Sequence, residues 1–237
     1  MSILQIKDIC KSYKKNNMII DHLNFEIPSG KIVGLLGPNG CGKSTLIKMI
    51  AGILQPNSGE ILVDNIPVGE TTCGLVSYLP ERTYFDNSMK VIDILDYFED
   101  FYSDFDRDRA NRLFADLAIP LDAKLKALSK GTKEKVQLVL VMSRNAKLYL
   151  LDEPIAGVDP AARDYILSTI VSNYNPEASI IITTHLITDI EPILDDYIFM
   201  GYTGTILLSG NAEVTRNNTG RSLDDLFREV FRCYGSF

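Results

Sequence analysis

The stretch Gly37-Pro38-Asn39-Gly40-Cys41-Gly42-Lys43-Ser44-Thr45 decides the fold that we expect for this chain. It has the phosphate-binding loop pattern G-x-x-x-x-G-K-[ST], in which glycines let consecutive backbone N–H groups turn toward a phosphate. The apolar residues 32–36 before the loop are typical of a strand, and 46–51 after it are typical of a helix, whose N-terminus favours anions. The setting therefore predicts a nucleoside triphosphate site, with Lys43 at the β/γ-phosphates and the Ser44 hydroxyl on Mg²⁺.

The composition of the chain is that of an ordinary α/β domain. Its 237 residues can bury a full apolar core. A formal net charge of −7 argues against a nucleic-acid-binding surface. The first seven residues lack the succession of a signal peptide, and the longest apolar runs are far shorter than the ~18 residues that a membrane span needs. We therefore expect a cytoplasmic protein with no membrane span of its own.

The four cysteines, Cys10, Cys41, Cys73 and Cys233, form neither a CxxC pair nor a metal-ligand spacing. Free thiols in a reducing compartment are expected. Cys41 is a special case because it lies inside the phosphate-binding loop, at the start of a helix. That environment lowers a thiol pKa, so the sequence predicts that maleimide inactivates the protein and that Mg-ATP protects it.

Several segments have the character of β-strands. Residues 4–9 and 22–27 alternate apolar and polar side chains, as half-buried strands do. Residues 148–151 and 180–184 are almost uniformly apolar, which is typical of central strands in a parallel sheet. Further strands are expected at 59–64 and 74–79, with a closing hairpin from 197–200 and 204–208.

Helices are expected in the middle and at the end of the chain. Apolar side chains recur every three or four residues over 91–105, which predicts an amphipathic helix whose acidic outer face is solvated. A second helix is expected at 107–117. Ser222 and Asp225 form a capping-box pattern at the start of the last helix.

Together, these blocks resemble the ATPase subunit of ATP-binding cassette (ABC) transporters, over about residues 3–210. Leu148-Tyr149-Leu150-Leu151-Asp152-Glu153-Pro154 resembles the Walker B strand of that family. The resemblance implies that Asp152 holds Mg²⁺ through water and that Glu153 polarises the attacking water. Capping of the next helix is the structural alternative for this carboxylate pair, and the nearby phosphate loop disfavours it.

Other family motifs follow in the same order. Leu128-Ser129-Lys130-Gly131-Thr132 resembles the signature LSGGQ, so Ser129 and Gly131 are implied to contact ATP held by an opposite subunit. Residues 156–160 resemble the D-loop. His185 matches the switch histidine at the γ-phosphate, and Tyr13 matches the aromatic residue that stacks on adenine, although a tyrosine alone is weak support.

One motif departs from the family pattern. The family has a Mg²⁺-binding glutamine after the strand at 74–79, whereas this chain has Glu81 in Tyr78-Leu79-Pro80-Glu81. A carboxylate is a stronger Mg²⁺ ligand than an amide oxygen, and it adds negative charge beside Asp152 and Glu153. The metal ligands expected are Ser44, Glu81 and Asp152. This glutamate and the signature helix are similar to those of bacterial exporter ATPases encoded apart from a membrane subunit.

The resemblance implies an α/β fold: a P-loop NTPase (RecA-like) core with an N-terminal antiparallel β-subdomain and an inserted α-helical subdomain. We expect a core at 1–86 and 145–215, a helical insert at 87–144 and a C-terminal helix at 216–237. All nine loop residues 37–45 are expected to contact ATP, with Lys43, Glu153 and His185 as the catalytic residues.

The implied function is ATP hydrolysis that powers export by a separate transmembrane permease, at the inner face of the plasma membrane. Two nucleotide-binding subunits, identical or different, would enclose two ATP. The alternative is a soluble ABC ATPase that acts on a macromolecular assembly. Ribosome-acting members usually carry two cassettes and DNA-repair members a long coiled coil, and the sequence contains neither.

The insert is rich in aromatic residues. Tyr97 and Phe101 fall outside the main apolar stripe of the helix at 91–105. They either pack internally or form an exposed surface on which the membrane subunit docks. Exposed aromatic residues beside the loop of Glu81 suit a partner's helix, so we predict that the insert carries the docking surface for the membrane subunit.

Overall fold

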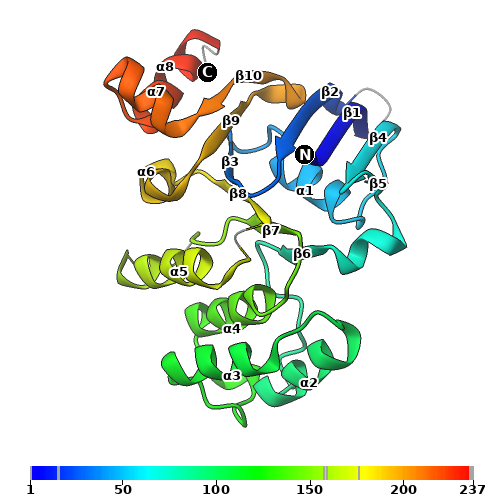
Figure 1. The fold of residues 1–237 in the computed structure, drawn as a ribbon, viewed down its shortest axis with the longest axis vertical. Helices are drawn as coiled ribbons and strands as arrows, with labels where there is room; N and C mark the ends of the chain where they lie inside the picture. The colour runs from blue at the N-terminus through cyan, green and yellow to red at the C-terminus, as the bar shows by residue number, and fades with distance from the viewer. Residues whose placement is uncertain (1, 15–16, 157, 159, 176, 235–237) are drawn as a thin grey trace.

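A six-stranded sheet runs through the centre of the molecule in the order β10-β9-β3-β8-β7-β6 (Figure 1). The computed structural model describes residues 2–14, 17–156, 158, 160–175 and 177–234. All neighbouring strands of this sheet are parallel except β9 and β10, which form the predicted closing hairpin. The strands are β3 (Ile32–Leu36), β6 (Val76–Leu79), β7 (Leu148–Asp152), β8 (Ser179–Thr184), β9 (Asp196–Met200) and β10 (Ile206–Asn211).

A second, antiparallel sheet has the order β2-β1-β4-β5. It lies beside α1 and the central sheet, at the upper right of Figure 1. Its strands are β1 (Ser2–Lys14), β2 (Asn17–Pro28), β4 (Ser58–Val63) and β5 (Ile66–Pro67).

Helices occupy the connections between strands. The α-helices are α1 (Lys43–Ile50), α2 (Val91–Phe101), α3 (Arg107–Asp116), α4 (Lys130–Met142), α5 (Pro160–Asn173), α6 (Ile187–Ile190), α7 (Ala212–Thr219) and α8 (Leu223–Tyr234). Short 3₁₀ turns are η1 (Glu70–Gly74), η2 (Leu125–Ala127), η3 (Glu191–Ile193) and η4 (Tyr202–Gly204). No helix in the described ranges is long and apolar enough to cross a bilayer.

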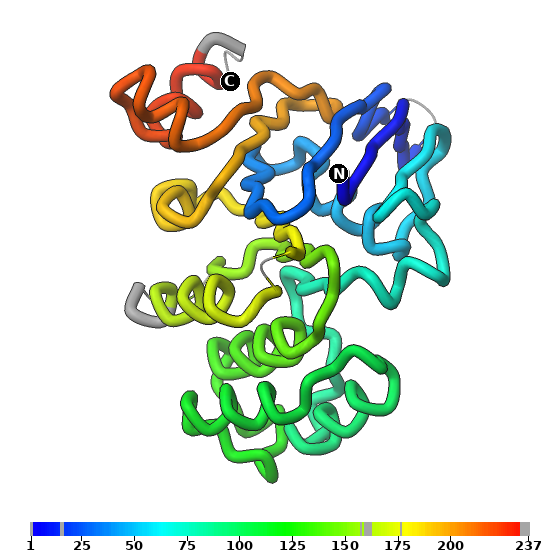
Figure 2. Tube along the Cα trace, viewed as in Figure 1, coloured from blue at the N-terminus to red at the C-terminus, as the bar shows by residue number. Residues whose placement is uncertain are grey.

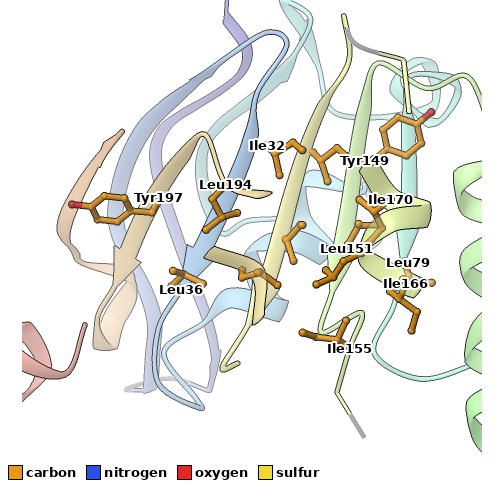
Figure 3. Close-up of a cluster of buried hydrophobic side chains, with 14 of the residues drawn as sticks. Ile32, Leu36, Leu79, Tyr149, Leu151, Ile155, Ile166, Ile170, Leu194 and Tyr197 are labelled. Atoms are coloured by element: carbon orange, nitrogen blue, oxygen red, sulfur yellow. The ribbon is translucent and has the colours of Figure 1, made fainter. Parts of the chain in front are cut away.

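The central strands are apolar throughout because both faces of the sheet are covered. Along β7, Tyr149 and Leu151 belong to one apolar cluster, together with side chains of α5 (Figure 3). Leu148 and Leu150 belong to a second cluster, which includes α1 and the inner face of the antiparallel sheet. Successive side chains of β7 point to opposite faces of the sheet, so one set packs against helices and the other against α1 and the antiparallel sheet.

Helices α2, α3 and α4 form the end of the molecule opposite the chain termini (Figure 2). They share a third apolar cluster, with Ile94, Phe98, Phe114 and Val139 among its buried members. Arg144, just after α4, joins this end to the sheet. Its guanidinium donates to the carbonyl oxygen of Val76 at 2.7 Å and pairs with Asp104 at 3.0 Å.

The structure confirms the α/β class and the antiparallel β-subdomain, and it corrects two helix boundaries. The helix predicted at 91–105 ends at Phe101, because the chain then turns and Phe105 bridges to Arg144. The segment at 216–237, expected as the C-terminal helix, contains the end of α7 and a separate α8, whereas the helix start predicted at Ser222 is confirmed. Gly220 takes a left-handed φ of 64° and ends α7, and Ser222 caps a separate α8 by accepting from the Asp225 N–H at 3.1 Å. The domain boundaries at 87 and 144 stay a prediction.

Candidate functional site

Three adjacent parallel strands end at one edge of the central sheet. Leu36 of β3 pairs with Thr184 of β8, and Asp152 of β7 pairs with Thr183. The segments that follow these strands therefore meet at this edge, where open α/β sheets bind ligands. A pocket of about 480 Å³ lies there. The predicted residues that line it are Asn39, Gly40, Gly42, Lys43, Ser44, Thr45, Glu81, Glu153 and His185.

The phosphate-binding loop is held by close packing and by glycine conformations. A Cβ atom on Gly37 would lie 2.3 Å from the carbonyl oxygen of Met200, so only glycine fits there. Gly42 has a φ of 110° directly before α1, which lets the loop turn into the helix. The buried Lys43 Nζ donates to the carbonyl oxygens of Gly37 at 2.7 Å and Pro38 at 3.2 Å. These two bonds hold the lysine ammonium against the first residues of the loop.

Asp152 lies at the centre of a hydroxyl network at the end of β7. Its Oδ1 accepts from the Ser44 hydroxyl at 3.0 Å and from the Thr183 hydroxyl at 2.6 Å. Thr183 Oγ1 in turn accepts from the backbone N–H of Glu153 at 3.1 Å. These bonds hold the carboxylate of Asp152 beside the first turn of α1 and fix the backbone of the next residue.

Glu153 and His185 form a pair over the pocket. His185 Nδ1 lies 3.0 Å from the Glu153 carboxylate. Glu153 has a left-handed φ of 54°, a conformation that costs a non-glycine residue about 1–3 kcal/mol and that is frequent at functional sites. Its backbone N–H donates to the carbonyl oxygen of Thr183 at 3.0 Å, which holds this strained turn.

Glu81 reaches the same pocket from the end of β6. The preceding carbonyl oxygen, of Pro80, accepts from the buried Gln137 side chain of α4 at 3.4 Å. Burial raises the pKa of the nearby Tyr78 phenol, and the charges of Asp152 and Glu81 raise it further. The tyrosine therefore stays neutral beside these carboxylates.

Tyr13 is exposed and adjoins the phosphate-binding loop. Its hydroxyl lies 3.3 Å from Thr45 Oγ1, and Lys11 Nζ lies 5.7 Å from the centre of its ring. The ring of Tyr13 is thus free to contact a base beyond the phosphate pocket, although it is not among the residues that line the pocket itself.

Ser129 and Gly131 are not brought into this pocket. Ser129 caps α4 by accepting from the Thr132 backbone N–H at 3.1 Å. Lys130 and Glu134 form an ion pair at 3.7 Å, so the charge of the lysine is partly offset on its own helix. Gly157 and Asp159 of the D-loop match lie outside the described residues.

The expectation that Cys41 is a reactive thiol is wrong. The residue is fully buried in the apolar cluster between α1 and the antiparallel sheet. Burial raises the pKa of its thiol, and the opposing effect of Lys43 is smaller. Cys41 therefore packs beneath the loop, and only its backbone is available to a phosphate.

Two residues of the site were missed by sequence reasoning. Thr183 bonds the Asp152 carboxylate and the Glu153 backbone, and Gln137 supports the loop that carries Glu81. Polar residues at the end of an apolar strand and within an apolar helix run were the available signals, because buried polar groups need partners. Neither signal names the partner.

Comparisons with known proteins agree with this geometry. The family model for ABC transporters matches residues 20–156, more than half of the chain. The chain belongs to the ABC transporter family. The ATP-binding protein LptB of the lipopolysaccharide export system of Haemophilus influenzae is 31% identical over 92% of this chain and 94% of its own length. The SkfA peptide export ATP-binding protein SkfE of Bacillus subtilis is 29% identical over 78% of this chain and 80% of its own.

A solved ATP-binding subunit of an ABC transporter superposes with a TM-score of 0.85, at 27% identity over 97% of this chain and 99% of that one. The predicted P-loop NTPase fold is thereby confirmed. This ABC protein is an ATP-binding subunit, and the subunits of its family are ATPases that power transport. Both relatives are named as export ATPases, which does not favour the alternative of a soluble factor.

Proposed function

We propose that this ABC ATPase powers export by a separate permease, using the pocket at the ends of β3, β7 and β8. The observation that carries the proposal is the meeting of Lys43, Ser44, Asp152, Glu153 and His185 at one sheet edge. The export functions in the names of the two relatives support the direction of transport.

The triphosphate of ATP would lie along the loop at 37–45. Backbone N–H groups of the loop and the N-terminus of α1 provide donors and a positive field for its oxygens. Lys43 would leave the carbonyl oxygens of Gly37 and Pro38 and donate to the β/γ-phosphates. The exposed ring of Tyr13 would stack on the adenine.

The donor set beside this loop suits Mg²⁺. The Ser44 hydroxyl and the Asp152 carboxylate lie within 3.0 Å of each other, and the Glu81 carboxylate lines the same pocket. All are oxygen ligands, which Mg²⁺ prefers. These residues would hold the ion, and its positive charge would offset the negative charge of the phosphates. Glu81 would thus take the place of the family's glutamine as a ligand and would add a full negative charge to the site.

Hydrolysis requires a water molecule in line with the γ-phosphate. Glu153 is held by the strained turn that follows β7, and its carboxylate would accept a proton from that water. His185 would keep the carboxylate oriented and contact the γ-phosphate from the end of β8.

The resemblance implies that the start of the signature helix also contacts ATP. In this chain that helix is α4, and its residues Ser129 and Gly131 do not line the pocket. A second nucleotide-binding subunit, either identical or different, would supply these residues. The N-terminus of its α4 would then face the phosphates held here, as a helix dipole favours. Two ATP would be enclosed between the two subunits.

The permease would dock beside α2. A groove of about 500 Å³ lies between the core and Tyr102, the residue directly after α2, with Ile53, Tyr84 and Arg144 also among its lining residues. Next to it, Tyr97 and Phe101 are 46% and 67% exposed and stack with their ring centres 4.2 Å apart. Exposed apolar side chains beside a groove suit a partner helix. This contact would hold the chain at the inner face of the plasma membrane.

The substitution Glu153→Gln tests the function. The amide keeps the size of the side chain but cannot accept the proton, so ATP hydrolysis should fall by roughly 10²–10⁴-fold. ATP affinity, measured by fluorescent nucleotide titration, should change little because the phosphate contacts remain. Glu213→Gln, at an exposed position on α7, is the matched control. Hydrolysis at the wild-type rate by Glu153→Gln would contradict the proposed role.

A further inference from the structure

The pairing of strands β1 and β2 contains register shifts that the function proposed above does not use. Lys11 pairs with Ile20 and Ile9 pairs with Leu23, so Asp21 and His22 together oppose Cys10. This is a β-bulge, in which two residues of one strand face a single residue of the other. His22 has a left-handed φ of 49° at this bulge. In a regular strand, Asp21 and His22 would point to opposite faces of the sheet.

A second bulge lies directly beside the first. Ile6 pairs with Phe25 and Ile9 with Leu23, and Asp8, between them on β1, has a left-handed φ of 52°. Asn24 secures both irregularities. Its side-chain oxygen accepts from the Asp8 N–H at 2.8 Å, and its amide donates to the His22 carbonyl oxygen at 2.8 Å. Two strained non-glycine residues are thus held in place by one asparagine.

The bulges bring three ligand types together. A carboxylate oxygen of Asp21, a ring nitrogen of His22 and the Cys10 sulfur lie within 4.8 Å of one another. Cys10 is buried and unpaired, and its sulfur also accepts from the His22 N–H at 3.3 Å. The two carboxyl–histidine contacts lie on opposite sides of the ring. His22 Nε2 is 3.8 Å from Asp21, whereas Nδ1 is 2.6 Å from Asp8.

This arrangement has the parts of a transition-metal site. Thiolate, imidazole and carboxylate are the three protein ligands of zinc, which they bind at about 2.0–2.3 Å. A histidine that ligates a metal through one nitrogen almost always uses the other nitrogen on a carboxylate or carbonyl oxygen, which fixes its tautomer. Asp8 occupies that supporting position on Nδ1.

We propose that Cys10, Asp21 and His22 Nε2 bind one Zn²⁺ ion, with Asp8 orienting the histidine and water completing the tetrahedral shell. Asp21 and His22 are consecutive on β2 and Cys10 lies on β1, so the cysteine spacing of the sequence carries no sign of this site. Ligand atoms as much as 4.8 Å apart must approach by about 1 Å to reach tetrahedral zinc distances, a shift that exposed side chains allow. The ion would join β1 to β2 below the strand ends that carry Tyr13 and Ile19, and so would stiffen the edge of the nucleotide pocket.

The first experiment titrates the full chain, reduced and free of nucleotide, with Zn²⁺ in a calorimeter and with Co²⁺ in a spectrophotometer. We expect one ion per chain, a near-ultraviolet band from thiolate to cobalt, and displacement of cobalt by zinc. The melting temperature should rise with Zn²⁺, since an ion that binds only the folded state stabilises it. Absence of the thiolate band in the wild type would overturn the proposal.

Substitutions assign the ligands. Cys10→Ser should abolish the thiolate band, and His22→Gln or Asp21→Asn, at exposed positions, should remove the stabilisation by zinc. Asp8→Asn should weaken zinc binding by roughly 10–100-fold, as loss of a supporting hydrogen bond does. Controls are Cys73→Ser and His185→Gln, which alter an exposed thiol and the other histidine of the chain. If His22→Gln and Asp21→Asn bind zinc as the wild type does, the proposal is wrong even if Cys10→Ser fails to fold.

Discussion

Thr183 shows how much of the pocket rests on a side chain that no motif contains. Its hydroxyl donates to Asp152 and accepts from the Glu153 N–H, so one threonine orients the carboxylate proposed to bind the metal and the turn that carries the proposed base. A buried hydroxyl that both donates and accepts a hydrogen bond holds its partners in place, because leaving a buried polar group unpaired costs about 1–3 kcal/mol. Thr183 thus fixes both the carboxylate of Asp152 and the backbone of Glu153.

Glu81 should bind Mg²⁺, because it lines the pocket with Ser44. Glu81→Gln should keep ATPase activity within about tenfold, since an amide oxygen still coordinates the metal. Glu81→Ala should raise the Mg²⁺ concentration needed for the half-maximal rate. The measurement is a Mg²⁺ titration of ATPase activity. Wild-type curves for both variants would place Glu81 away from the metal.

Cys41 should resist thiol reagents in the folded protein. Because burial raises its pKa, less of the thiol is ionised at any given pH than for a cysteine of ordinary pKa, and Cys73 is exposed whereas Cys41 is not. Maleimide labelling followed by peptide mass spectrometry should modify Cys73 first, with or without Mg-ATP, and labelling of Cys41 should increase only as the pH rises or the protein unfolds. Rapid labelling of native Cys41 at neutral pH would contradict its buried position.

At the scale of the elements, α2 owes its end to a tertiary contact. The apolar spacing continues to Phe105, yet the helix stops at Phe101. Arg144 pairs with Asp104 and lies 3.9 Å from the centre of the Tyr102 ring, which draws the chain after α2 toward β6. The periodicity of apolar residues predicts which face of a helix is buried. It does not predict the residue at which a contact with a distant side chain, here Arg144, stops the helix.

The stacked pair on α2 should serve the permease and contribute little to the fold. Tyr97→Ala with Phe101→Ala removes two exposed rings whose mutual contact is worth about 0.5–1.5 kcal/mol. Basal ATPase activity should be unchanged, whereas stimulation by the permease in proteoliposomes should be lost. Val214→Ala, at another exposed apolar position, should leave stimulation intact.

Thermal melting distinguishes the two readings of this pair. A small change in melting temperature with lost stimulation supports a docking surface. Loss of folding in the double variant would mean that the two rings are structural and would leave the docking site of the permease to be sought elsewhere.

At the scale of the molecule, the separation of Ser129 and Gly131 from the phosphate pocket predicts an ATP-dependent dimer. Glu153→Gln with Mg-ATP should elute from size-exclusion columns at twice the monomer mass, because bound ATP is not consumed. Light scattering on the column gives the mass, and ADP should leave the protein monomeric.

Gly131 offers a matched pair of controls for the dimer. No atom lies within 4 Å of a Cβ built there, so substitution does not disturb the fold of one copy. In the Glu153→Gln background, Gly131→Asp should abolish the dimer by placing a negative charge against phosphate, whereas Gly131→Ala should keep it. A dimer that withstands Gly131→Asp would mean that α4 does not face the partner's nucleotide.

Much of the fold and the site was predictable because it depends on neighbours in sequence. The loop at 37–45, the apolar strands β7 and β8 and the carboxylates after β7 all follow from local patterns, and their order along the chain indicated the family. Parallel strands then place Glu153 and His185 at one edge without further information. The cap of α4 at Ser129 is also a local bond, since the serine side chain satisfies a backbone donor of its own helix.

The sequence by itself therefore determined the chemistry of the phosphate pocket, because hydrogen bonding, turn geometry and periodicity act over a few residues. Only the tertiary structure decided that Cys41 is buried and that Cys10 meets His22 across two bulges. Each of these depends on what another segment places beside the residue. Burial sets the pKa of a thiol, strand register sets which side chains meet, and neither quantity is contained in a local stretch of chain.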